Sequence, residues 1–322
     1  MKEIIPDEGR KQLRGSVLPA LLQSIAGVAK CLRESLSISQ AGSTNTSGDS
    51  QLNVDLATNE IIHAAIKKCP SIVAASSEED EGENLVKHEI TAAGNESNEN
   101  YTIAFDPLDG SSIISANFSV GTIIGIWHGD TALNRDPQKH QIASILGVIG
   151  PRTTAIVAIR LPDIERCFEV GVDDQDGTIL VLREFVKFAH MSDVTTRYFA
   201  PANLRAAAHD RAYNKLVNHL IDREYTLRYS GGLVPDIVHA LVKGHGVYVS
   251  PVTARSKAKL RRLYELAPVA LIVECAGGCA VDPATGNTIL ATSIGGVDDK
   301  SGLLCGTKEE VEMALRVLNN EI

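Results

Sequence analysis

The chain has 322 residues, of which 44% are apolar and 22% are charged, and its net charge is −9. This length exceeds the roughly 100–200 residues of an ordinary domain, so we expect two packed domains or one large layered unit. The acidic balance argues against a nucleic-acid partner, because nucleic-acid-binding proteins typically present a basic face. The first residues lack the apolar core of a secretory signal, and we find no apolar run of about 18 residues that would span a membrane. We therefore expect no membrane partner and a cytoplasmic location, or an organelle if a targeting segment was removed.

In the first part of the chain, the hydrophobic spacing predicts two helices separated by a polar loop. Apolar residues recur at helical spacing from Leu13 to Val28, which predicts an amphipathic helix over residues 9–34. Residues 42–50 are rich in Gly, Ser, Thr and Asn, as is typical of a loop. A second helix is expected from about residue 56 to residue 68.

The middle of the chain is predicted to consist mainly of strands. Apolar runs indicate strands at residues 71–75, 101–105 and 120–127, followed by a hairpin of strands 142–149 and 155–159. The pattern loosens around residues 185–200. We therefore predict an N-terminal metal-binding α+β domain, residues 1–190, and a C-terminal α/β substrate-binding domain, residues 191–322.

The second half alternates helical patterns with short apolar runs. This mixed order predicts an α/β or α+β layered architecture. The expected helices are residues 202–221, 233–242 and 308–319, and the expected strands are residues 245–249, 269–274 and 288–293.

The strongest functional signal is the segment DPLDGSS, residues 106–112. Asp106 ends a predicted strand, Pro107 keeps the residue before it extended, and Asp109 returns three positions later at a turn. Two carboxylates from one rigid corner are the hard oxygen ligands that Mg²⁺ prefers. The turn Gly110–Ser112 can open a helix, and its N–H groups suit a phosphate oxygen. A simple Asx turn with a helix cap is the alternative for this motif alone.

Two further acidic segments lie upstream. The run Ser77-Glu78-Glu79-Asp80 directly follows the apolar run 71–75. Adjacent residues of an extended chain point in opposite directions, so one glutamate can bind metal while the other handles a water molecule. A solvated acidic surface is the alternative for this run. Asp49 and Asp55 lie earlier still, and each could instead be a turn residue or a helix cap.

Together these segments hold the elements of a multi-metal phosphoester hydrolase. In such an enzyme several carboxylates gather two or more Mg²⁺ ions, which polarise the phosphoryl group and lower the pKa of a bound water. A carboxylate that binds no metal then accepts the proton of that water.

The same segments resemble a known family. FDPLDGSS, SEED and the GD-x5-D segment are similar to class I fructose-1,6-bisphosphatases and the related sedoheptulose-1,7-bisphosphatases, within the wider inositol monophosphatase-like phosphatases. The resemblance extends through YTLRYSGGLVPD, residues 225–236, and SKAKLRRLYE, residues 256–265. It implies a layered α-β-α-β-α sandwich, a homo-oligomer (dimer or tetramer), two or three Mg²⁺ ions with Mn²⁺ as a substitute, and a small sugar bisphosphate as substrate.

Carried over position by position, the resemblance also implies three groups of site residues. The implied metal ligands are Glu78, Asp106, the Leu108 carbonyl, Asp109 and Glu265, with Asp49 at a further metal. Asp55 and Glu79 would position or deprotonate the attacking water. The implied substrate-binding residues are Gly110, Ser111, Ser112, Asn203, Arg228, Tyr229, Gly231, Lys259 and Arg261. Of these, Lys259 and Arg261 fall on one face of an extended segment, where they can grip phosphate oxygens, and Arg228 would reach a neighbouring subunit's site.

Several positions favour a seven-carbon substrate over a six-carbon one. Ile113 stands where fructose enzymes have Asn, and NFSVGT, residues 117–122, resembles the sedoheptulose type. Gly232 replaces a Ser, which would leave room for a seventh carbon. We therefore expect hydrolysis of sedoheptulose 1,7-bisphosphate to sedoheptulose 7-phosphate and phosphate.

Three alternatives stay open. A fructose-1,6-bisphosphatase or a dual-specificity enzyme is the main one. A non-catalytic sugar-phosphate sensor is remote, because each expected carboxylate position is acidic. An inositol monophosphatase is disfavoured, because Arg228, Lys259 and Arg261 imply a second phosphate to hold.

Overall fold

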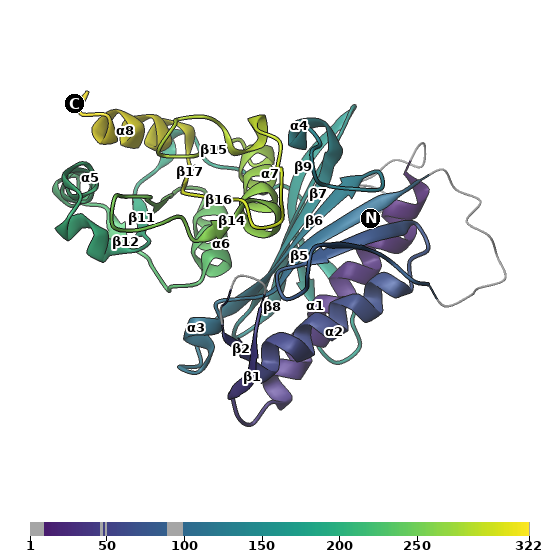
Figure 1. Ribbon diagram of the computed structural model, residues 1–322. Helices are drawn as coiled ribbons and strands as arrows, with labels where there is room; N and C mark the ends of the chain where they lie inside the picture. Colours follow the sequence, from purple (N-terminus) through teal and green to yellow (C-terminus); the bar gives the residue numbers. More distant parts are fainter. Residues whose placement is uncertain (1–9, 46–47, 49, 89–98, 322) are drawn as a thin grey trace.

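The computed structural model describes residues 10–45, 48, 50–88 and 99–321, and these residues form five layers. From one side to the other the layers are a helix pair, a large sheet, a second helix pair, a smaller sheet and a third helix pair (Figure 1). The predicted α/β class and the α-β-α-β-α layering are therefore confirmed.

The first helix pair covers one face of the large sheet. Its first helix begins as the π-helical turn η1 (Leu13–Val17) and continues as α1 (Leu18–Glu34), and α2 spans Asn53–Lys67. β1 (Gln40–Thr44) and β2 (Ser50–Leu52) form a small antiparallel pair, which overlaps the two ends of the segment 42–50 that we predicted as a loop. The α2 helix begins earlier than predicted, because Asp55 accepts a hydrogen bond from the N–H of Leu52 in its first turn.

Eight of the described strands form the large sheet, in the order β10-β9-β8-β7-β6-β5-β3-β4. Neighbouring strands are antiparallel except β3 and β5, which are parallel. The strands predicted at 71–75, 101–105 and 120–127 and the predicted hairpin are all present, whereas β4, β9 and β10 were not predicted. The bounds are β3 (Ile72–Ser77), β4 (Glu83–Leu85), β5 (Tyr101–Asp109), β6 (Val120–His128), β7 (Gln141–Ile149), β8 (Thr153–Leu161), β9 (Ile164–Val172) and β10 (Ile179–Arg183), with short helices α3 (Ser111–Ile114) and α4 (Pro137–His140) between them.

The smaller sheet has the order β12-β11-β13-β17-β15. Two helices, α6 (Leu233–Lys243) and α7 (Ala267–Cys275), lie between the two sheets, and α5 (Arg211–Asp222) and α8 (Lys308–Leu318) cover the outer face (Figure 1). The strand bounds are β11 (Tyr198–Pro201), β12 (Thr226–Leu227), β13 (Val247–Ser250), β15 (Cys279–Val281) and β17 (Leu303–Gly306), and β14 (Leu260–Arg261) pairs with β16 (Lys300–Ser301) outside this sheet.

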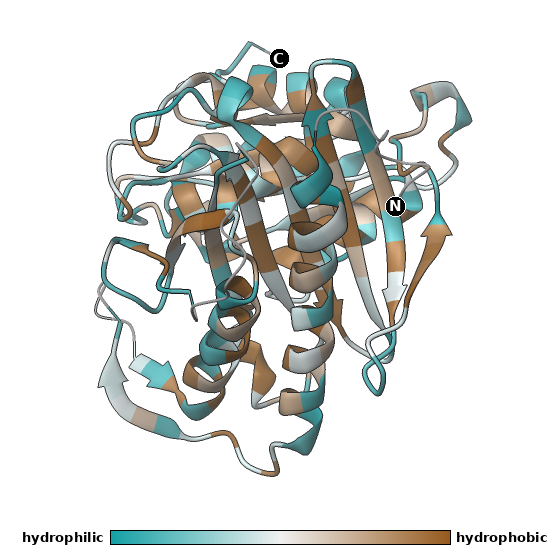
Figure 2. Ribbon diagram, turned by 90° about the vertical axis from the view of Figure 1, so that its right-hand side faces the viewer, coloured by the Kyte–Doolittle hydropathy of each residue, from teal (hydrophilic) through white to brown (hydrophobic). Residues whose placement is uncertain are grey.

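Three hydrophobic clusters hold the layers together. One joins the first helix pair to the large sheet, the second fills the space between the two sheets around α6 and α7, and the third joins the smaller sheet to α5 and α8. In Figure 2 the hydrophobic residues concentrate on the sheet and on the helix faces next to it, whereas the peripheral loops are mostly hydrophilic. Burial of apolar surface at about 25 cal/mol per Å² is the main stabilising term for such a fold.

Two predicted strands of the second half are wrong. Residues 269–274 belong to α7, whose residues are almost all buried, and residues 288–293 contain the 3-10 turn η5 (Ile289–Ala291). A helix that is buried on every side shows no amphipathic period, so its short apolar run cannot be told from a buried strand by pattern alone.

The division at residue 190 stays a prediction. The strands of the two sheets do separate between Arg183 and Tyr198, but α6 and α7 of the later half pack against strands β6 and β7 of the first. One helix of the described residues, Leu13–Glu34, is long and apolar enough to cross a membrane by length and composition. Half of its most apolar window is buried inside the fold, against α2 and the large sheet.

Candidate active site

The acidic segments 77–80 and 106–109 meet at one edge of the large sheet. Because β3 and β5 are parallel neighbours, their carboxyl ends lie side by side, with Ser77 paired to Phe105. The chain continues in register for one more residue, since the N–H of Glu78 donates to the Phe105 carbonyl at 3.0 Å. Glu78 and Asp106 therefore leave two adjacent strands at the same place, although 28 residues separate them in sequence.

A β-bulge in β5 controls where Asp109 lies. Asp106 pairs with Ile123 of β6 but Asp109 pairs with Gly121, so β5 contains one more residue than β6 over this stretch. In a regular strand, residues three apart point to opposite faces, and the extra residue of a bulge reverses that relation. The Thr122 hydroxyl donates to the Pro107 carbonyl at 3.0 Å and holds the bulge. The predicted turn therefore starts at Gly110, after a strand that extends through both aspartates.

The amino end of α6 packs directly on Asp109. The carboxylate of Asp109 accepts hydrogen bonds from the N–H groups of Leu233 at 3.1 Å and Val234 at 2.7 Å. Gly121 permits this approach, because a Cβ at that position would lie 2.3 Å from the Cβ of Val234. Asp109 thus caps a helix that begins 124 residues later in the chain, and whose own N-cap, Gly232, has no side chain.

Glu265 and Arg261 reach the same cluster from the segment before α7. Glu265 lies in the π-helical turn η4 (Arg262–Leu266) and accepts a hydrogen bond from the Arg261 N–H at 2.5 Å. The Arg261 guanidinium is buried, 3.2 Å from the Glu78 carboxylate and 3.0 Å from the Glu78 carbonyl. The predicted phosphate-binding arginine is therefore turned toward a carboxylate of the cluster.

Burial and mutual repulsion act on the carboxylates of this cluster. Burial raises the pKa of Asp106 well above its usual value, and the charges of Glu78, Asp109 and Glu265 raise it further. Burial also raises the pKa of Asp109 to about 6, against the lowering effect of the two α6 N–H groups. The pKa of Glu265 rises for the same reasons, burial first and Glu78 second. The cluster therefore holds more negative charge than a buried site normally tolerates without a cation.

A second carboxylate pair lies beside the first group. One oxygen of Asp55 accepts the Leu52 N–H at 2.7 Å, and the Glu79 carboxylate accepts from the Gln51 amide at 2.5 Å. Burial raises the pKa of Asp55 to about 6, and the nearby Glu79 charge contributes to the rise. This is the environment in which a carboxylate can exchange a proton near neutral pH.

The donor chemistry of the cluster fits hard divalent cations. All its side-chain donors are carboxylates, which are the ligands that Mg²⁺ prefers. The Oδ1 atom of Asp55 is buried and has no hydrogen-bond partner among the described residues. In the described part of the chain, however, no three acidic, histidine or cysteine groups are arranged as a complete metal site, since Asp109 and Glu265 each turn toward backbone N–H groups. Asp49 lies outside the described residues.

The predicted substrate residues differ in exposure and backbone conformation. The turn Gly110–Ser112 follows Asp109 directly, and the hydroxyl-bearing residues of α3 are exposed. Gly231 adopts a left-handed backbone with φ 101°, in the loop that leads into α6. Burial raises the pKa of the half-exposed Tyr229, and the neighbouring charge of Asp236 raises it further.

For three predicted substrate residues, the structure gives no contact with the carboxylate cluster among the described residues. Asn203 donates to the Ser256 hydroxyl at 2.9 Å and accepts from Arg205, while the guanidinium of Arg228 lies 5.6 Å from the Tyr198 ring centroid. Lys259 is exposed, and no hydrogen bond or ion pair joins it to the carboxylates in the described structure.

The expected space beside Gly232 is filled by protein. A Cβ at Gly232 would lie 3.1 Å from the Pro235 Cδ and 3.4 Å from the Ile113 Cδ1. Glycine at position 232 therefore leaves room for the side chains of Pro235 and Ile113. The steric argument that it leaves room for a seventh carbon is not supported.

Two family models match the chain. The model described as "Fructose-1-6-bisphosphatase, N-terminal domain" matches residues 4–171, and "Fructose-1-6-bisphosphatase, C-terminal domain" matches residues 193–319. The chain belongs to the fructose-1,6-bisphosphatase family. This confirms the resemblance, and membership of a metal-dependent phosphatase family agrees with the chemistry of the cluster.

The relatives of this chain include proteins named for each of the two substrates. It is 36% identical to the chloroplastic sedoheptulose-1,7-bisphosphatase of Triticum aestivum over 273 residues, 83% of this chain and 63% of that protein. It is 31% identical to the class 1 fructose-1,6-bisphosphatase of Syntrophotalea carbinolica over 305 residues, 94% of this chain and 89% of that protein. The chain thus spans less than two thirds of the length of the curated plant and algal relatives that it matches.

Solved structures of the bisphosphatase family have the same fold. A protein from Toxoplasma gondii assigned as a sedoheptulose-1,7 bisphosphatase superposes with a TM-score of 0.86 at 30% identity, over 100% of this chain and 99% of that one. The fructose-1,6-bisphosphatase of Leishmania major in its holo form gives a TM-score of 0.83 at 25% identity, over 99% of this chain and 98% of that one.

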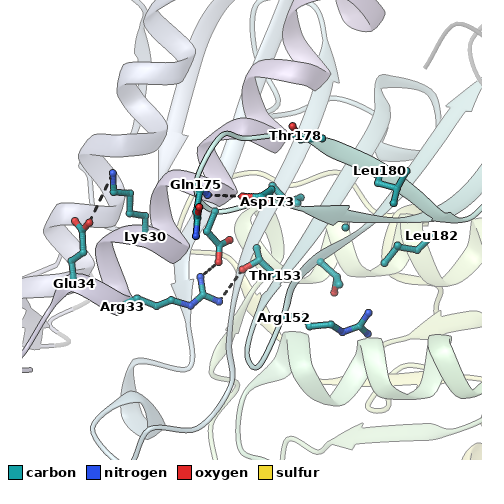
Figure 3. A pocket seen from close by; sticks show the side chains of 14 residues that line it. Lys30, Arg33, Glu34, Arg152, Thr153, Asp173, Gln175, Thr178, Leu180 and Leu182 are labelled. Atoms are coloured by element: carbon teal, nitrogen blue, oxygen red, sulfur yellow. Dashed lines mark hydrogen bonds and ion pairs between the residues drawn. The ribbon is translucent and has the colours of Figure 1, made fainter.

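A cavity of about 780 Å³ between the end of α1 and the β9–β10 turn contains none of the predicted site residues (Figure 3). Arg33 forms an ion pair with Asp174 and donates to the Thr153 hydroxyl at 3.1 Å, and Lys30 lies 3.9 Å from Glu34. Acidic and basic side chains both line this cavity, and the ion pairs they form are partly exposed to solvent. We therefore place the candidate active site of this bisphosphatase-family chain at the end of β5, where buried carboxylates are in excess.

Sequence reasoning missed two residues of this region. Gln51 binds Glu79, and Asp236 in the first turn of α6 accepts hydrogen bonds from the loop before it. An aspartate four residues after Gly-Gly, in a segment with helical spacing, is a signal that could have indicated a first-turn carboxylate. No local sequence pattern could have indicated the role of Gln51, because its partner Glu79 lies 28 residues away.

Proposed function

We propose that the chain hydrolyses the C1 phosphate of a sugar bisphosphate, with sedoheptulose 1,7-bisphosphate as the preferred substrate. The observation that supports this proposal most is the cluster of buried carboxylates at the end of β5, whose pKa values are raised by burial and by one another. Such a cluster suits divalent cations that in turn hold a phosphate. Sedoheptulose 7-phosphate and inorganic phosphate would be the products.

Two or three Mg²⁺ ions, or Mn²⁺ in their place, would be held by the carboxylates of the cluster. When bound, they would polarise the phosphoryl group and lower the pKa of a water molecule. The residues proposed to hold them are Glu78, Asp106, the Leu108 carbonyl, Asp109 and Glu265, with Asp49 at a further ion.

Asp55 and Glu79 are the proposed pair that handles the attacking water. Asp55 has a buried oxygen to which no described residue donates a hydrogen bond and a pKa of about 6, so it can accept a proton at neutral pH. Glu79 is held by Gln51 and raises the proton affinity of Asp55 through its charge. The water oxygen attacks phosphorus while one of its protons passes to Asp55. The bond between phosphorus and the sugar oxygen breaks, and that oxygen takes up a proton from solvent and leaves as the C1 hydroxyl.

The remaining predicted residues would hold the substrate. The N–H groups and hydroxyls of Gly110, Ser111 and Ser112 are proposed to bind the reacting phosphate, since they follow Asp109 directly. Arg261, Lys259, Tyr229 and Gly231 would hold the sugar and the retained phosphate together with Asn203. Arg228 would reach this site from the partner subunit of a homodimer or tetramer.

A six-carbon substrate is the alternative, and one observation favours it. The class 1 fructose-1,6-bisphosphatase relative matches along most of its own length, whereas the curated plant and algal sedoheptulose-1,7-bisphosphatases are matched over less than two thirds of theirs. An enzyme that accepts both substrates would agree with both matches.

Phosphate release from each sugar bisphosphate tests the proposal. The purified chain is treated with EDTA, and its activity is measured on sedoheptulose 1,7-bisphosphate and fructose 1,6-bisphosphate with and without added Mg²⁺ or Mn²⁺. We expect activity only with metal and a higher kcat/KM for the seven-carbon substrate. A higher kcat/KM for the six-carbon substrate would reverse the preference, and no release from either would refute the proposed function.

A further inference from the structure

The loop that enters α6 has a hydrogen bond at every one of its five backbone N–H groups from Ser230 to Val234. Two carboxylates, one on each side of the loop, accept four of these bonds. Asp236 accepts from Ser230 at 2.7 Å and Gly231 at 3.4 Å, Asp109 accepts from Leu233 at 3.1 Å and Val234 at 2.7 Å, and the Ser230 hydroxyl accepts from Gly232 at 3.2 Å.

Asp236 is placed to organise the loop rather than to bind a ligand itself. It lies in the first turn of α6 and is only 6% exposed, and its carboxylate turns back toward the residues before the helix. The Ser230 side chain also bonds to this carboxylate, so Ser230 links Asp236 to the Gly232 N–H. Buried hydrogen bonds to a carboxylate are stronger than neutral ones, which makes this part of the loop stiff.

The loop held in this way contains the residues that we propose to contact the sugar. Tyr229 precedes the first bonded N–H group, and Gly231 is fixed in its left-handed conformation within the loop. On the other side, the loop ends on Asp109, a proposed metal ligand. A shift of the segment 229–232 would therefore move the substrate contacts relative to the carboxylate cluster.

We propose that Asp236 is a positioning residue for substrate binding, which sets the place of the loop Tyr229–Leu233 relative to Asp109. This inference rests on the proposed function, because it assigns a role to the loop that would hold the sugar. Among the described residues no hydrogen bond joins Asp236 to a proposed metal ligand; it acts through the Ser230 and Gly231 N–H groups.

The test compares Asp236→Ala with Asp236→Asn and with a matched control. Asp236→Ala should raise KM for the bisphosphate about tenfold while kcat changes much less, as expected when a buried hydrogen-bond acceptor is lost. Asp236→Asn keeps one acceptor oxygen and should recover most of the wild-type KM. The control is Asp210→Ala, which removes a carboxylate acceptor at the amino end of another helix: Asp210 is the N-cap of α5 and accepts from the Tyr213 N–H at 2.8 Å. It should leave KM unchanged.

Amide hydrogen exchange supplies a second measurement that does not depend on turnover. Exchange at Ser230–Val234 should quicken in Asp236→Ala and not in Asp210→Ala. If Asp236→Ala does not fold, Ser230→Ala replaces it, because that change removes the Gly232 acceptor without emptying a buried carboxylate position. It should also raise KM.

The outcomes separate the two proposals. An active Asp236→Ala variant with wild-type KM and unchanged exchange in the loop would overturn the positioning role alone. Equal loss of kcat and gain of KM in Asp236→Ala and Asp210→Ala would show a merely structural effect and overturn it as well. A wild-type chain that releases no phosphate would overturn the proposed function, and with it the role of Asp236 in substrate binding.

Discussion

Two charged regions of the molecule differ in how their acids are placed. In the cavity beside α1, Asp174 pairs with Arg33, and both side chains are partly exposed to solvent. At the end of β5, by contrast, Asp106, Asp109 and Glu265 are each at most 8% exposed and raise one another's or their neighbours' pKa values. In the first region basic side chains neutralise the acidic ones. In the second, the buried carboxylates outnumber the basic side chains beside them.

The difference indicates which region needs a ligand. A surface ion pair contributes at most about 1 kcal/mol and is stable as it stands. Several buried carboxylates close together raise the free energy of the folded state until protons or cations neutralise them. The sequence has acidic residues in both regions, and burial rather than composition marks the second as a cation site.

The largest expected effect is on activity, from Asp106→Asn. This change removes a proposed metal ligand, so kcat/KM should fall by at least about 100-fold, or roughly 2.7 kcal/mol of transition-state stabilisation. The same change removes repulsion inside the cluster, so the metal-free variant at pH 8 should unfold at a higher temperature than the wild type. Phosphate release and thermal unfolding in EDTA measure the two effects.

A lower unfolding temperature together with wild-type activity would contradict the assignment of the cluster. The informative result is the combination of gained stability and lost activity, because a variant that is merely misfolded loses both. Added Mg²⁺ should raise the unfolding temperature of the wild type and have a smaller effect on Asp106→Asn.

The layered architecture was predicted correctly from the sequence, but some individual helices and strands were not. The first helix, the strands at 101–105 and 120–127, and the hairpin were predictable because each is long or has a clear period. α7 was predicted as a strand because residues 269–274 are apolar and buried on all sides, which removes the helical period. Whether such a segment forms a helix or a strand depends on the residues that pack around it, and these lie far away in the sequence.

For the site, the sequence could predict the acidic residues but not how they interact. Glu78 and Asp106 were expected to lie close together because both were predicted as ligands of one multi-metal site. The pairing of Arg261 with Glu78 was not predictable, since 183 residues separate the two. The same holds for Asp109, whose carboxylate binds α6 N–H groups far along the chain.

The second prediction concerns pH and metal together. The pKa values of Asp55 and Asp109 are about 6 in the folded chain, above the value of about 3.9 expected when unfolded. Their protonated forms therefore stabilise the metal-free fold below pH about 4, and this stabilisation is lost as pH rises through about 6. Because cations replace the protons, Mg²⁺ should raise the unfolding temperature more at pH 8 than at pH 5.

Thermal unfolding in EDTA and in Mg²⁺ at both pH values measures this coupling. An equal effect of Mg²⁺ at pH 5 and pH 8 would mean that metal binding releases no protons from the cluster. Asp106→Asn serves as the control here, since it should reduce the pH dependence of the metal-free form.

The third prediction tests how closely the cluster depends on packing. Gly121→Ala would place a Cβ 2.3 Å from the Val234 Cβ, so α6 must shift away from Asp109. We expect a loss of about 1–3 kcal/mol in stability from overpacking. We also expect a raised KM, because the loop before α6 moves with the helix. Denaturant unfolding and steady-state kinetics measure the two effects.

Gly15→Ala is the matched control for this packing test. Gly15 lies in the first helix, and a Cβ there would meet nothing within 4 Å. Alanine in a helix is favoured over glycine by about 0.5–1 kcal/mol, so this variant should be slightly more stable and fully active. If both glycine variants behaved alike, close packing at Gly121 would not be what sets the place of α6.

The smallest expected effect comes from Asp174→Asn, in the balanced region. The change removes the ion pair with Arg33, whose side chain is 41% exposed, so the loss in stability should be below about 1 kcal/mol. Activity should stay within about twofold, since no proposed site residue lines this cavity. The sign of the stability change is opposite to that of metal-free Asp106→Asn, although both replace one aspartate by asparagine. The two changes have opposite effects because the surroundings differ: Asp174 lies beside the Arg33 cation, whereas Asp106 lies among other carboxylates.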